Sequence, residues 1–162
     1  MDFDIVEATT NDEFAEAGIL GVRLVRFHHA LDPGRFTLCE GGEAAYAETL
    51  KASITTLTSS IVLLARDRTD RRSLGYLYGQ LQEAEFDATI GACGHLHELY
   101  VGDEARHRGV GKALLGAFLS RARIIGSRRI VVMVASANIA AQDLFSLGGF
   151  APTMLEMICE FL

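Results

Sequence analysis

The sequence predicts a mixed α/β (α+β) domain, with a central, mostly antiparallel sheet, helices on both faces and the order β-α-α-β-β-β-α-β-α-β. Two helical patterns precede the second strand pattern. Three strand patterns then follow one another, and strand and helix alternate towards the C-terminus. This order excludes a pure βαβ repeat. The 162 residues, 49% of them hydrophobic, suit one domain over residues 1–162 with a sizeable core.

The N-terminal part of the chain predicts one strand and two helices. Residues 4–9 have the pattern of a short strand. Thr10 and Glu13 have the spacing of a capping box, which predicts a helix that extends to about residue 30 and ends before a Pro-Gly pair. A second helical pattern covers residues 43–57.

The middle of the chain predicts three strands in succession, over residues 59–67, 73–86 and 89–101. The first is a buried apolar run, and the second alternates. A charged turn, RDRTDRR, joins these two, so we expect them to form a hairpin.

The C-terminal part predicts alternating helices and strands. The expected elements are a helix over 109–125 that Gly126 ends, a buried strand over 128–136, a short helix over 138–147 that begins at Asn138, and an alternating last strand over 153–161.

Composition and charge restrict the cellular location and the classes of partner that we expect. The net charge of −6 argues against nucleic acid as the main partner. The apolar runs are too short to span a membrane, and the acidic N-terminus lacks the features of a signal peptide, so we expect a cytoplasmic protein. Cys39, Cys93 and Cys159 show neither metal spacing nor a disulfide framework, and they suit a reducing compartment.

The charge is unevenly distributed along the chain. Residues 1–50 carry ten acidic side chains against three arginines, whereas residues 106–129 carry seven basic side chains and no acid. The acidic first third would therefore favour a cationic ligand, and the basic stretch an anion. For most of these residues a solvated surface is the simpler interpretation.

Gly109 and Gly111 form a glycine-rich turn directly before a helix, which is typical of an anion site. A P-loop does not fit, because Arg106 stands at its first glycine and Ala113 where Mg²⁺ needs a hydroxyl. A dinucleotide fingerprint does not fit either, because Leu114 stands at its third glycine. The first-turn N–H groups and nearby basic side chains still predict a pyrophosphate that is held and not cleaved.

Three stretches resemble the GNAT family of N-acetyltransferases. The turn resembles the family's R/Q-x-x-G-x-G/A signature, residues 98–101 resemble its fourth strand, and residues 138–150 match N-x-x-A-x-x-L-[YF]-x-x-x-G-F. The order of elements agrees over the whole chain, although the first 60 residues match in pattern alone. The resemblance implies the acyl-CoA N-acyltransferase fold and acetyl transfer to an amine.

The resemblance also implies how acetyl-CoA is held. Its pyrophosphate would lie mostly on backbone N–H groups of the turn, at Arg106, His107, Arg108, Gly109, Val110, Gly111 and Lys112. Its pantetheine arm would pair with the strand end from Leu99 to Val101, because the fourth and fifth strands splay apart. Asn138 would hydrogen-bond the arm, and a strand N–H near Leu99 or Tyr100 would polarise the acetyl carbonyl.

Glu98 is the first candidate for the base that takes the proton from the amine, directly or through water, because it lies beside the expected thioester. An ion pair with an arginine is an equally good interpretation of Glu98. His95 and His97 are rival bases, which alternation places on the opposite face unless a bulge intervenes.

Phe145 stands where many members of the family carry a tyrosine that protonates the departing thiolate. Tyr100, Tyr76 or Tyr78 could replace it, or the thiolate could leave unaided, because a thiol pKa is about 8.5. In either case Phe145 would pack against the cofactor arm. An alternative function is a non-catalytic acyl-CoA sensor on the same fold, and a nucleotide-binding module is a weaker one.

Other candidate residues bear on metals and on the acceptor. Cys93, His95 and His97 are spaced too far apart along a strand to converge on a metal, so no metal is expected. His28, His29 and Asp32 could wall the acceptor site, although an ordinary helix end is the simpler interpretation. We expect a small or peptidic amine, cationic given the acidic first third, and the family makes a homodimer possible.

Overall fold

The computed structural model describes residues 2–38, 41–56, 60–81 and 93–159. The elements are β1 (Phe3–Glu7), α1 (Asn11–Leu31), α2 (Gly42–Thr56), β2 (Ser60–Asp67), β3 (Ser73–Leu81), β4 (Gly94–Val101), a 3₁₀ turn (Asp103–Ala105), α3 (Val110–Ile125), β5 (Ile130–Val132) and α4 (Ile139–Leu147). The five strands form one sheet in chain order, antiparallel from β1 to β4, with β5 parallel to β4.

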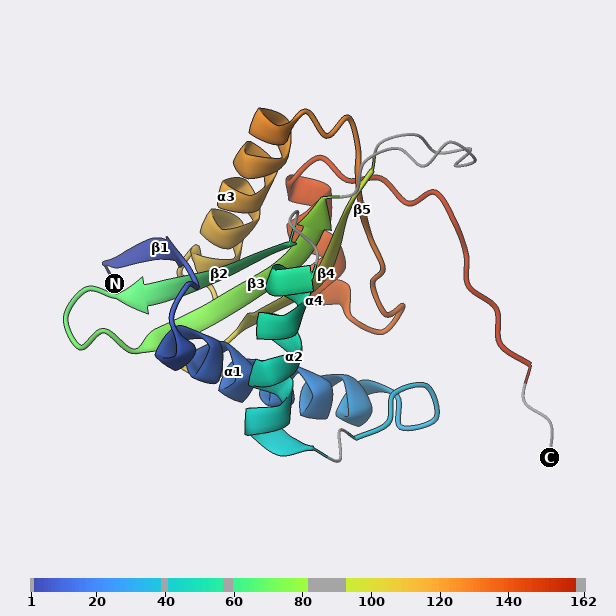
Figure 1. Cartoon of the computed structure of the whole chain (residues 1–162). Helices are drawn as coiled ribbons and strands as arrows, with labels where there is room; N and C mark the ends of the chain where they lie inside the picture. Colours follow the sequence, from blue (N-terminus) through green and yellow to red (C-terminus); the bar gives the residue numbers. More distant parts are fainter. Residues whose placement is uncertain (1, 39–40, 57–59, 82–92, 160–162) are drawn as a thin grey trace.

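Helices cover both faces of this sheet, as predicted (Figure 1). The face under α1 and α2 buries a cluster that includes Leu20, Leu50 and Tyr76. The other face lies under α3 and α4, and its cluster includes Phe118 and Phe145. Two separate cores therefore hold the sheet from its two sides.

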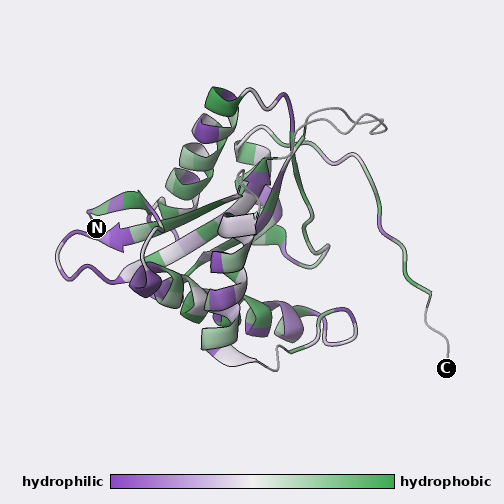
Figure 2. Cartoon of the chain, viewed as in Figure 1, coloured by the Kyte–Doolittle hydropathy of each residue, from purple (hydrophilic) through white to green (hydrophobic). Residues whose placement is uncertain are grey.

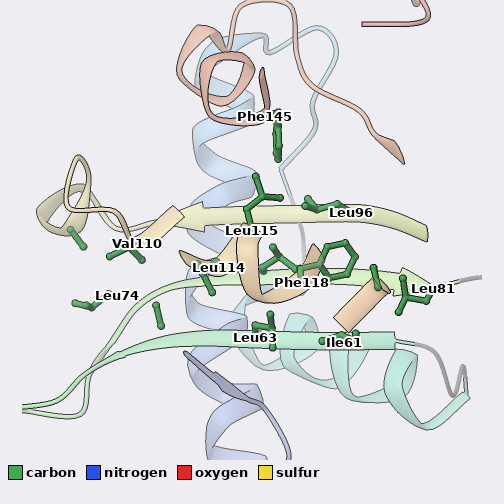
Figure 3. Packing of buried hydrophobic residues seen from close by; sticks show 14 residues of the cluster. Ile61, Leu63, Leu74, Leu81, Leu96, Val110, Leu114, Leu115, Phe118 and Phe145 are labelled. Atoms are coloured by element: carbon green, nitrogen blue, oxygen red, sulfur yellow. The ribbon is translucent and has the colours of Figure 1, made fainter. Parts of the chain in front are cut away.

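The α3-side core depends on close contact between the helix and the strands. Figure 3 shows Leu114 and Phe118 among the side chains of this core, and both are fully buried. A Cβ added at Gly79 would lie 2.4 Å from the ring of Phe118, so β3 needs a glycine there. Replacing Phe118 with alanine would cost about 3–5 kcal/mol.

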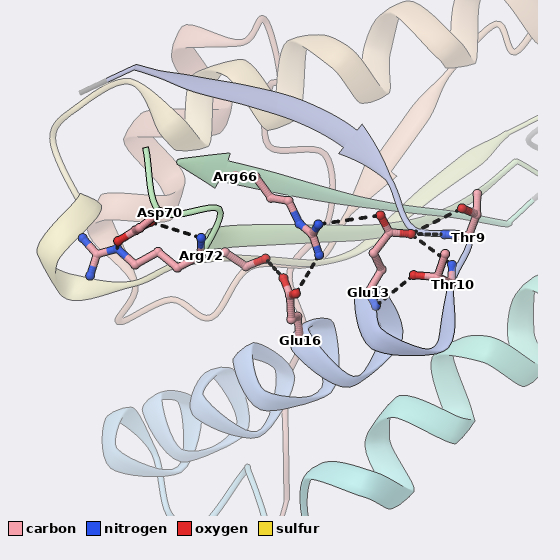
Figure 4. A network of polar contacts seen from close by, with 8 residues as sticks. Thr9, Thr10, Glu13, Glu16, Arg66, Asp70 and Arg72 are labelled. Carbon is pink, nitrogen blue, oxygen red and sulfur yellow. Dashed lines mark hydrogen bonds and ion pairs between the residues drawn. The ribbon is translucent and has the colours of Figure 1, made fainter. Parts of the chain in front are cut away.

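The start of α1 forms the predicted capping box. The backbone N–H groups of Thr9 and Thr10 donate to the Glu13 carboxylate at 2.8 and 3.0 Å, and Thr10 accepts from the Glu13 N–H. Figure 4 shows the network continuing to Arg66, which pairs with Glu16 at 2.6 Å. The capping box accounts for Glu13, and the ion pair ties α1 to β2.

The turn between β2 and β3 is hydrophilic. Figure 2 shows hydrophilic residues along the β2–β3 turn, where Arg72 pairs with Asp70. No helix among the residues that the structure describes is both long and apolar enough to cross a membrane.

One strand prediction needs new bounds, and two others extend beyond the described residues. β5 covers residues 130–132 and not 128–136. Among the described residues β3 ends at Leu81 and β4 begins at Gly94, so Cys93 lies outside the strand predicted for it. The rest of the two predicted ranges, 82–86 and 89–92, lies outside the described residues, as does Cys39.

The predicted last strand is wrong for its described part, residues 153–159, which has no regular structure. Met154 and Met157 are exposed, and Glu156 pairs with Arg35 at 2.9 Å. Alternation of apolar and polar residues shows that a segment could lie on a sheet. To form a strand, the segment must also pair with a free edge of that sheet. In this structure the segment extends away from β5 (Figure 1).

Candidate active site

A β-bulge in β4 shapes the site. Tyr78 lies opposite Glu98 and Gly79 lies opposite Leu96, so His97 is an extra residue on β4. A bulge of this kind bends the strand and shifts the alternation of side chains by one position.

The bulge brings the three candidate bases onto one face of the sheet. His97 stacks on Tyr78 with ring centroids 5.2 Å apart, and His95 stacks on His97 at 6.0 Å. Tyr78 belongs to the cluster under α1 and α2, and Glu98 bonds to Tyr76 of the same cluster. The expectation that the histidines lie opposite Glu98 is therefore wrong, because the regular period is broken at His97.

Glu98 is held by two tyrosine hydroxyls. Tyr76 of β3 donates to one carboxylate oxygen at 2.7 Å, and Tyr46 of α2 donates to the other. Burial raises the pKa of the Glu98 carboxyl above its ordinary value, and the two hydroxyl donors partly offset that rise. Within the described residues the partners of Glu98 are thus tyrosines, in place of the arginine considered from the sequence.

Tyr46 is a site residue that the sequence interpretation missed. It reaches Glu98 because α2 packs very closely on α1, at two glycines one turn apart. A Cβ at Gly18 would lie 2.5 Å from the Glu43 carbonyl oxygen, and one at Gly21 would lie 2.1 Å from the Tyr46 ring. The G-x-x-G spacing on a helix face was the signal that could have indicated this contact.

His97 is a base candidate of different character. Burial, and then the neighbouring charge of His95, lower the pKa of His97. Its Nε2 lies 3.1 Å from the amide oxygen of Gln80. A lowered pKa keeps the imidazole neutral at pH 7, so the ring could accept a proton, but it also has a structural partner.

The sheet opens next to Glu98. β4 and β5 pair from Gly94–Ile130 to Leu96–Val132, and their ladder ends directly before the bulged His97. Residues 98–101 therefore have β3 on one side and no ladder to β5 on the other. This is the split that the resemblance implied for Leu99 and Val101.

The glycine turn has the backbone of an anion cradle. His107 and Gly109 both have left-handed φ angles, 60° and 82°, and a Cβ added at Gly109 would meet nothing within 4 Å. α3 begins at Val110 with no side-chain cap and no acidic residue in its first turn. Its first N–H groups therefore have no helical partner, which suits a phosphate.

The glycine at position 111 allows the helix to start close to the split. A Cβ there would lie 3.2 Å from Leu144 of α4 and 3.6 Å from Val101. Lys112 is exposed at the same helix end. Arg108, between His107 and Gly109, is also exposed.

The Arg106 side chain does not point into this cradle. Its Nε donates to the Val101 carbonyl at 3.2 Å and its Nη2 pairs with Asp103 at 2.9 Å. The guanidinium carbon lies 5.4 Å from the Phe27 ring centroid and 5.8 Å from that of Tyr100. The Arg106 guanidinium is therefore held towards α1, and a backbone N–H contact of residue 106 with the pyrophosphate stays a prediction.

Arg106 instead lines a hollow of about 470 Å³ between α1 and the end of β4, which we call the arginine hollow. Its lining residues are Arg23, Arg26, Phe27, Tyr100, Asp103, Glu104 and Arg106.

Asn138 and Phe145 occupy the α4 side of the split. The Asn138 side-chain oxygen caps α4 by accepting from the Ala141 N–H at 3.2 Å, which leaves its NH₂ group for another acceptor. Phe145 is buried in the α3-side core and lies edge-on to Phe150, with centroids 5.5 Å apart.

The residues at the end of α1 have structural partners. His29 Nδ1 lies 2.7 Å from the Phe36 carbonyl oxygen, His28 stacks on the Phe36 ring, and Asp32 accepts from the Arg35 N–H. Burial lowers the pKa of His28. These contacts support the helix-end interpretation of His28, His29 and Asp32. Among the described side chains, no three His, Cys, Asp or Glu residues are grouped to hold a metal ion.

A model of the acetyltransferase (GNAT) family matches residues 27–150, which is most of the chain. The chain belongs to the GNAT family. Membership makes it an acyltransferase of a family that uses acetyl-CoA and transfers acetyl groups. No curated protein sequence matches it as a relative.

Solved structures share the fold of this GNAT protein at low identity. A mutant form of a Bacillus halodurans protein has a TM-score of 0.85 at 19% identity, covering 98% of this chain and 99% of that one. The ribosomal-protein-alanine N-acetyltransferase of Brucella melitensis has a TM-score of 0.72 at 19% identity, covering 99% and 100%. AAC(6')-Iy, in complex with a CoA-based bisubstrate analogue, has a TM-score of 0.71 at 17% identity, covering 100% and 99%.

Proposed function

We propose that the protein transfers the acetyl group of acetyl-CoA to a primary amine by direct attack, with Glu98 as the general base. The observation that carries this proposal is a part-buried carboxylate of raised pKa beside the split between β4 and β5. A raised pKa makes the ionised carboxylate a better proton acceptor.

The donor would be held by the residues that surround the split. The backbone N–H groups at Val110, Gly111 and Lys112 would bind its pyrophosphate, and the strand end at 99–101 together with Asn138 would hold the pantetheine arm. When bound, acetyl-CoA supplies a thioester carbonyl that an amine can attack. A free strand N–H near Leu99 or Tyr100 would donate to that carbonyl oxygen.

In the proposed step the amine arrives as an ammonium ion and gives a proton to the Glu98 carboxylate. The nitrogen lone pair then forms a bond to the acetyl carbon, and the carbon–sulfur bond breaks with its electron pair on sulfur. The second amine proton leaves to water, and the thiolate takes up a proton. Tyr46 and Tyr76 keep their hydroxyl protons and orient the carboxylate.

Tyr100 is our candidate for the proton donor to the thiolate. The hydroxyl of Tyr76 is bonded to Glu98 and that of Tyr78 accepts from Gln80, whereas among the described residues Tyr100 has no hydroxyl partner. Its ring lines the arginine hollow. Phe145 has no proton to give.

Free thiol released from acetyl-CoA, measured with a panel of amines, tests the proposal. We expect at least one amine to support turnover, and Glu98→Gln to lower kcat/KM by about 100-fold or more, since general-base catalysis contributes roughly 10²–10⁴-fold. Glu48→Gln, an exposed carboxylate on the same helix as Tyr46, is the matched control and should leave turnover unchanged.

Two outcomes would contradict the proposal. Full activity of Glu98→Gln would remove Glu98 as the base. Stabilisation by CoA without thiol release for any amine would favour the non-catalytic acyl-CoA sensor.

A further inference from the structure

The charges of the arginine hollow do not balance. Asp103 is paired with Arg106 at 2.9 Å. The Glu104 carboxylate lies over Gly102, where an added Cβ would be 3.0 Å from it. Arg23 and Arg26 are exposed, and neither has an ion pair or hydrogen bond within the described residues. Three arginines against two carboxylates leave the hollow with an excess of one positive charge, and Arg23 and Arg26 lie one helical turn apart.

The acids of the first third of the chain do not neutralise these arginines. Asp2 and Asp4 pair with Arg68, and Glu7 pairs with Arg121. Glu13 and Glu16 are engaged with the cap of α1 and with Arg66 (Figure 4), and neither lines the hollow. The acidic composition that suggested a cationic acceptor is thus largely used in contacts elsewhere.

The third arginine of the hollow is held rigidly. Arg106 is bonded to the Val101 carbonyl and to Asp103, and it lies near the rings of Phe27 and Tyr100. A guanidinium positioned by four contacts loses little freedom when a ligand binds. The hollow therefore has one arginine held by several contacts and two exposed arginines without an ion pair among the described residues.

The arginine hollow reaches β4 at Tyr100, two residues after the proposed base, and Glu98 itself does not line it. Tyr100 lines it, and Glu98 is two residues earlier on the same face of β4, a distance of about 7 Å along a strand. A ligand that fills the hollow can thus place another group next to Glu98.

We propose that the arginine hollow binds a carboxylate or phosphate of the acceptor, so that the substrate is an amine that also carries an anionic group, separated by roughly two residue lengths of strand. Arg23 and Arg26 recognise the anion, because guanidinium groups bind carboxylate and phosphate through paired hydrogen bonds. This inference rests on the proposed function, and it replaces the cationic acceptor expected from composition.

Four amines with the same six-carbon chain test the inference: hexylamine, hexanediamine, aminohexanoate and aminohexyl phosphate. We expect kcat/KM for one or both anionic amines to exceed that for hexylamine by about tenfold or more, since a hydrogen bond to a charged group contributes roughly that factor. The two anionic arms distinguish carboxylate from phosphate. A preference for hexanediamine or hexylamine would overturn the inference.

The double variant Arg23→Gln with Arg26→Gln locates the effect. We expect it to raise the KM of the anionic amine and to abolish its advantage over hexylamine, with the KM of acetyl-CoA unchanged. Arg128→Gln with Arg129→Gln, which removes two exposed charges elsewhere, should preserve the preference. A rise in the KM of acetyl-CoA in the first variant, with the amine preference intact, would assign these arginines to the donor phosphates and overturn the inference.

Calorimetric binding separates failure of the inference from failure of the proposed function. If no amine releases thiol, aminohexanoate and aminohexyl phosphate are titrated into the CoA complex. Binding that the double variant loses would support the hollow as an anion site without catalysis, and absence of binding would overturn it.

Discussion

Glu98 is the residue whose chemistry depends most on its surroundings. Its position on a strand was evident from the sequence, but its pKa depends on burial and on hydroxyls from α2 and β3. Burial raises the pKa of Glu98, and each hydroxyl that donates to the carboxylate lowers it. Tyr46 and Tyr76 therefore tune the base as well as orienting it.

Tyr46→Phe tests this tuning. Loss of one donor raises the pKa of Glu98 further, so the carboxylate stays protonated to a higher pH. Because the base must be ionised, the acidic limb of the kcat/KM profile should move to higher pH, and activity below that limb should fall. Tyr78→Phe is the control, since the Tyr78 hydroxyl bonds to Gln80, and its profile should keep the original limb. An unmoved limb in Tyr46→Phe would show that Tyr46 does not tune Glu98.

At the scale of elements, the bulge in β4 lies beside both the proposed base and the proposed donor site. It carries His97 out of register, aligns His95 and His97 with Glu98, and lies where the β4–β5 ladder ends. Gly79 and Tyr78 stay opposite Leu96 and Glu98 on either side of it. The extra residue, His97, thus marks the point at which pairing between β4 and β5 ends.

Deletion of His97 tests the role of the bulge. Leu96 and Glu98 would become neighbours and keep their faces, so the protein should fold with an unchanged circular dichroism spectrum. The strand would straighten, and we expect kcat/KM to fall by about 100-fold through misplaced groups. His97→Ala keeps the bulge and should retain activity within a few fold. Equal losses in both variants would point to the imidazole itself as the base, contrary to our assignment.

At the scale of the whole molecule, the two cores support different parts of the proposed site. The core under α1 and α2 surrounds the Glu98 cluster, whereas the core under α3 and α4 carries the cradle for the donor. The donor would lie at the split between them, in contact with elements of both faces. Its binding should therefore stabilise the fold as a whole.

Thermal unfolding with and without acetyl-CoA tests this. At a concentration roughly 100 times Kd, binding to the folded state adds about 2.7 kcal/mol, which raises Tm by about 5–10 °C for a domain of this size. ATP and NAD should produce no comparable shift. A shift with either nucleotide and none with acetyl-CoA would favour the nucleotide-binding module and contradict our assignment of the cradle.

The sequence predicted local features well where one segment contains the whole signal. The capping box at Thr10 and Glu13, the uncapped helix start at Gly109 and the buried run of β2 all follow from neighbouring residues. It predicted the last strand wrongly, because pairing depends on a second edge. It missed Tyr46, because residues 46 and 98 meet through the packing of α2 on α1.

The sequence by itself determined the family, the fold class and the glycine cradle, because these are carried by contiguous motifs and their order. The tertiary structure alone decided which face His95 and His97 occupy, what surrounds Glu98, and where the arginines gather. A bulge changes the face on which a side chain lies without changing the strand pattern of the sequence. An ion pair neutralises a charge without changing the composition. The acidic first third therefore indicated a cation, whereas the hollow at the end of β4 is lined by three arginines and two acids.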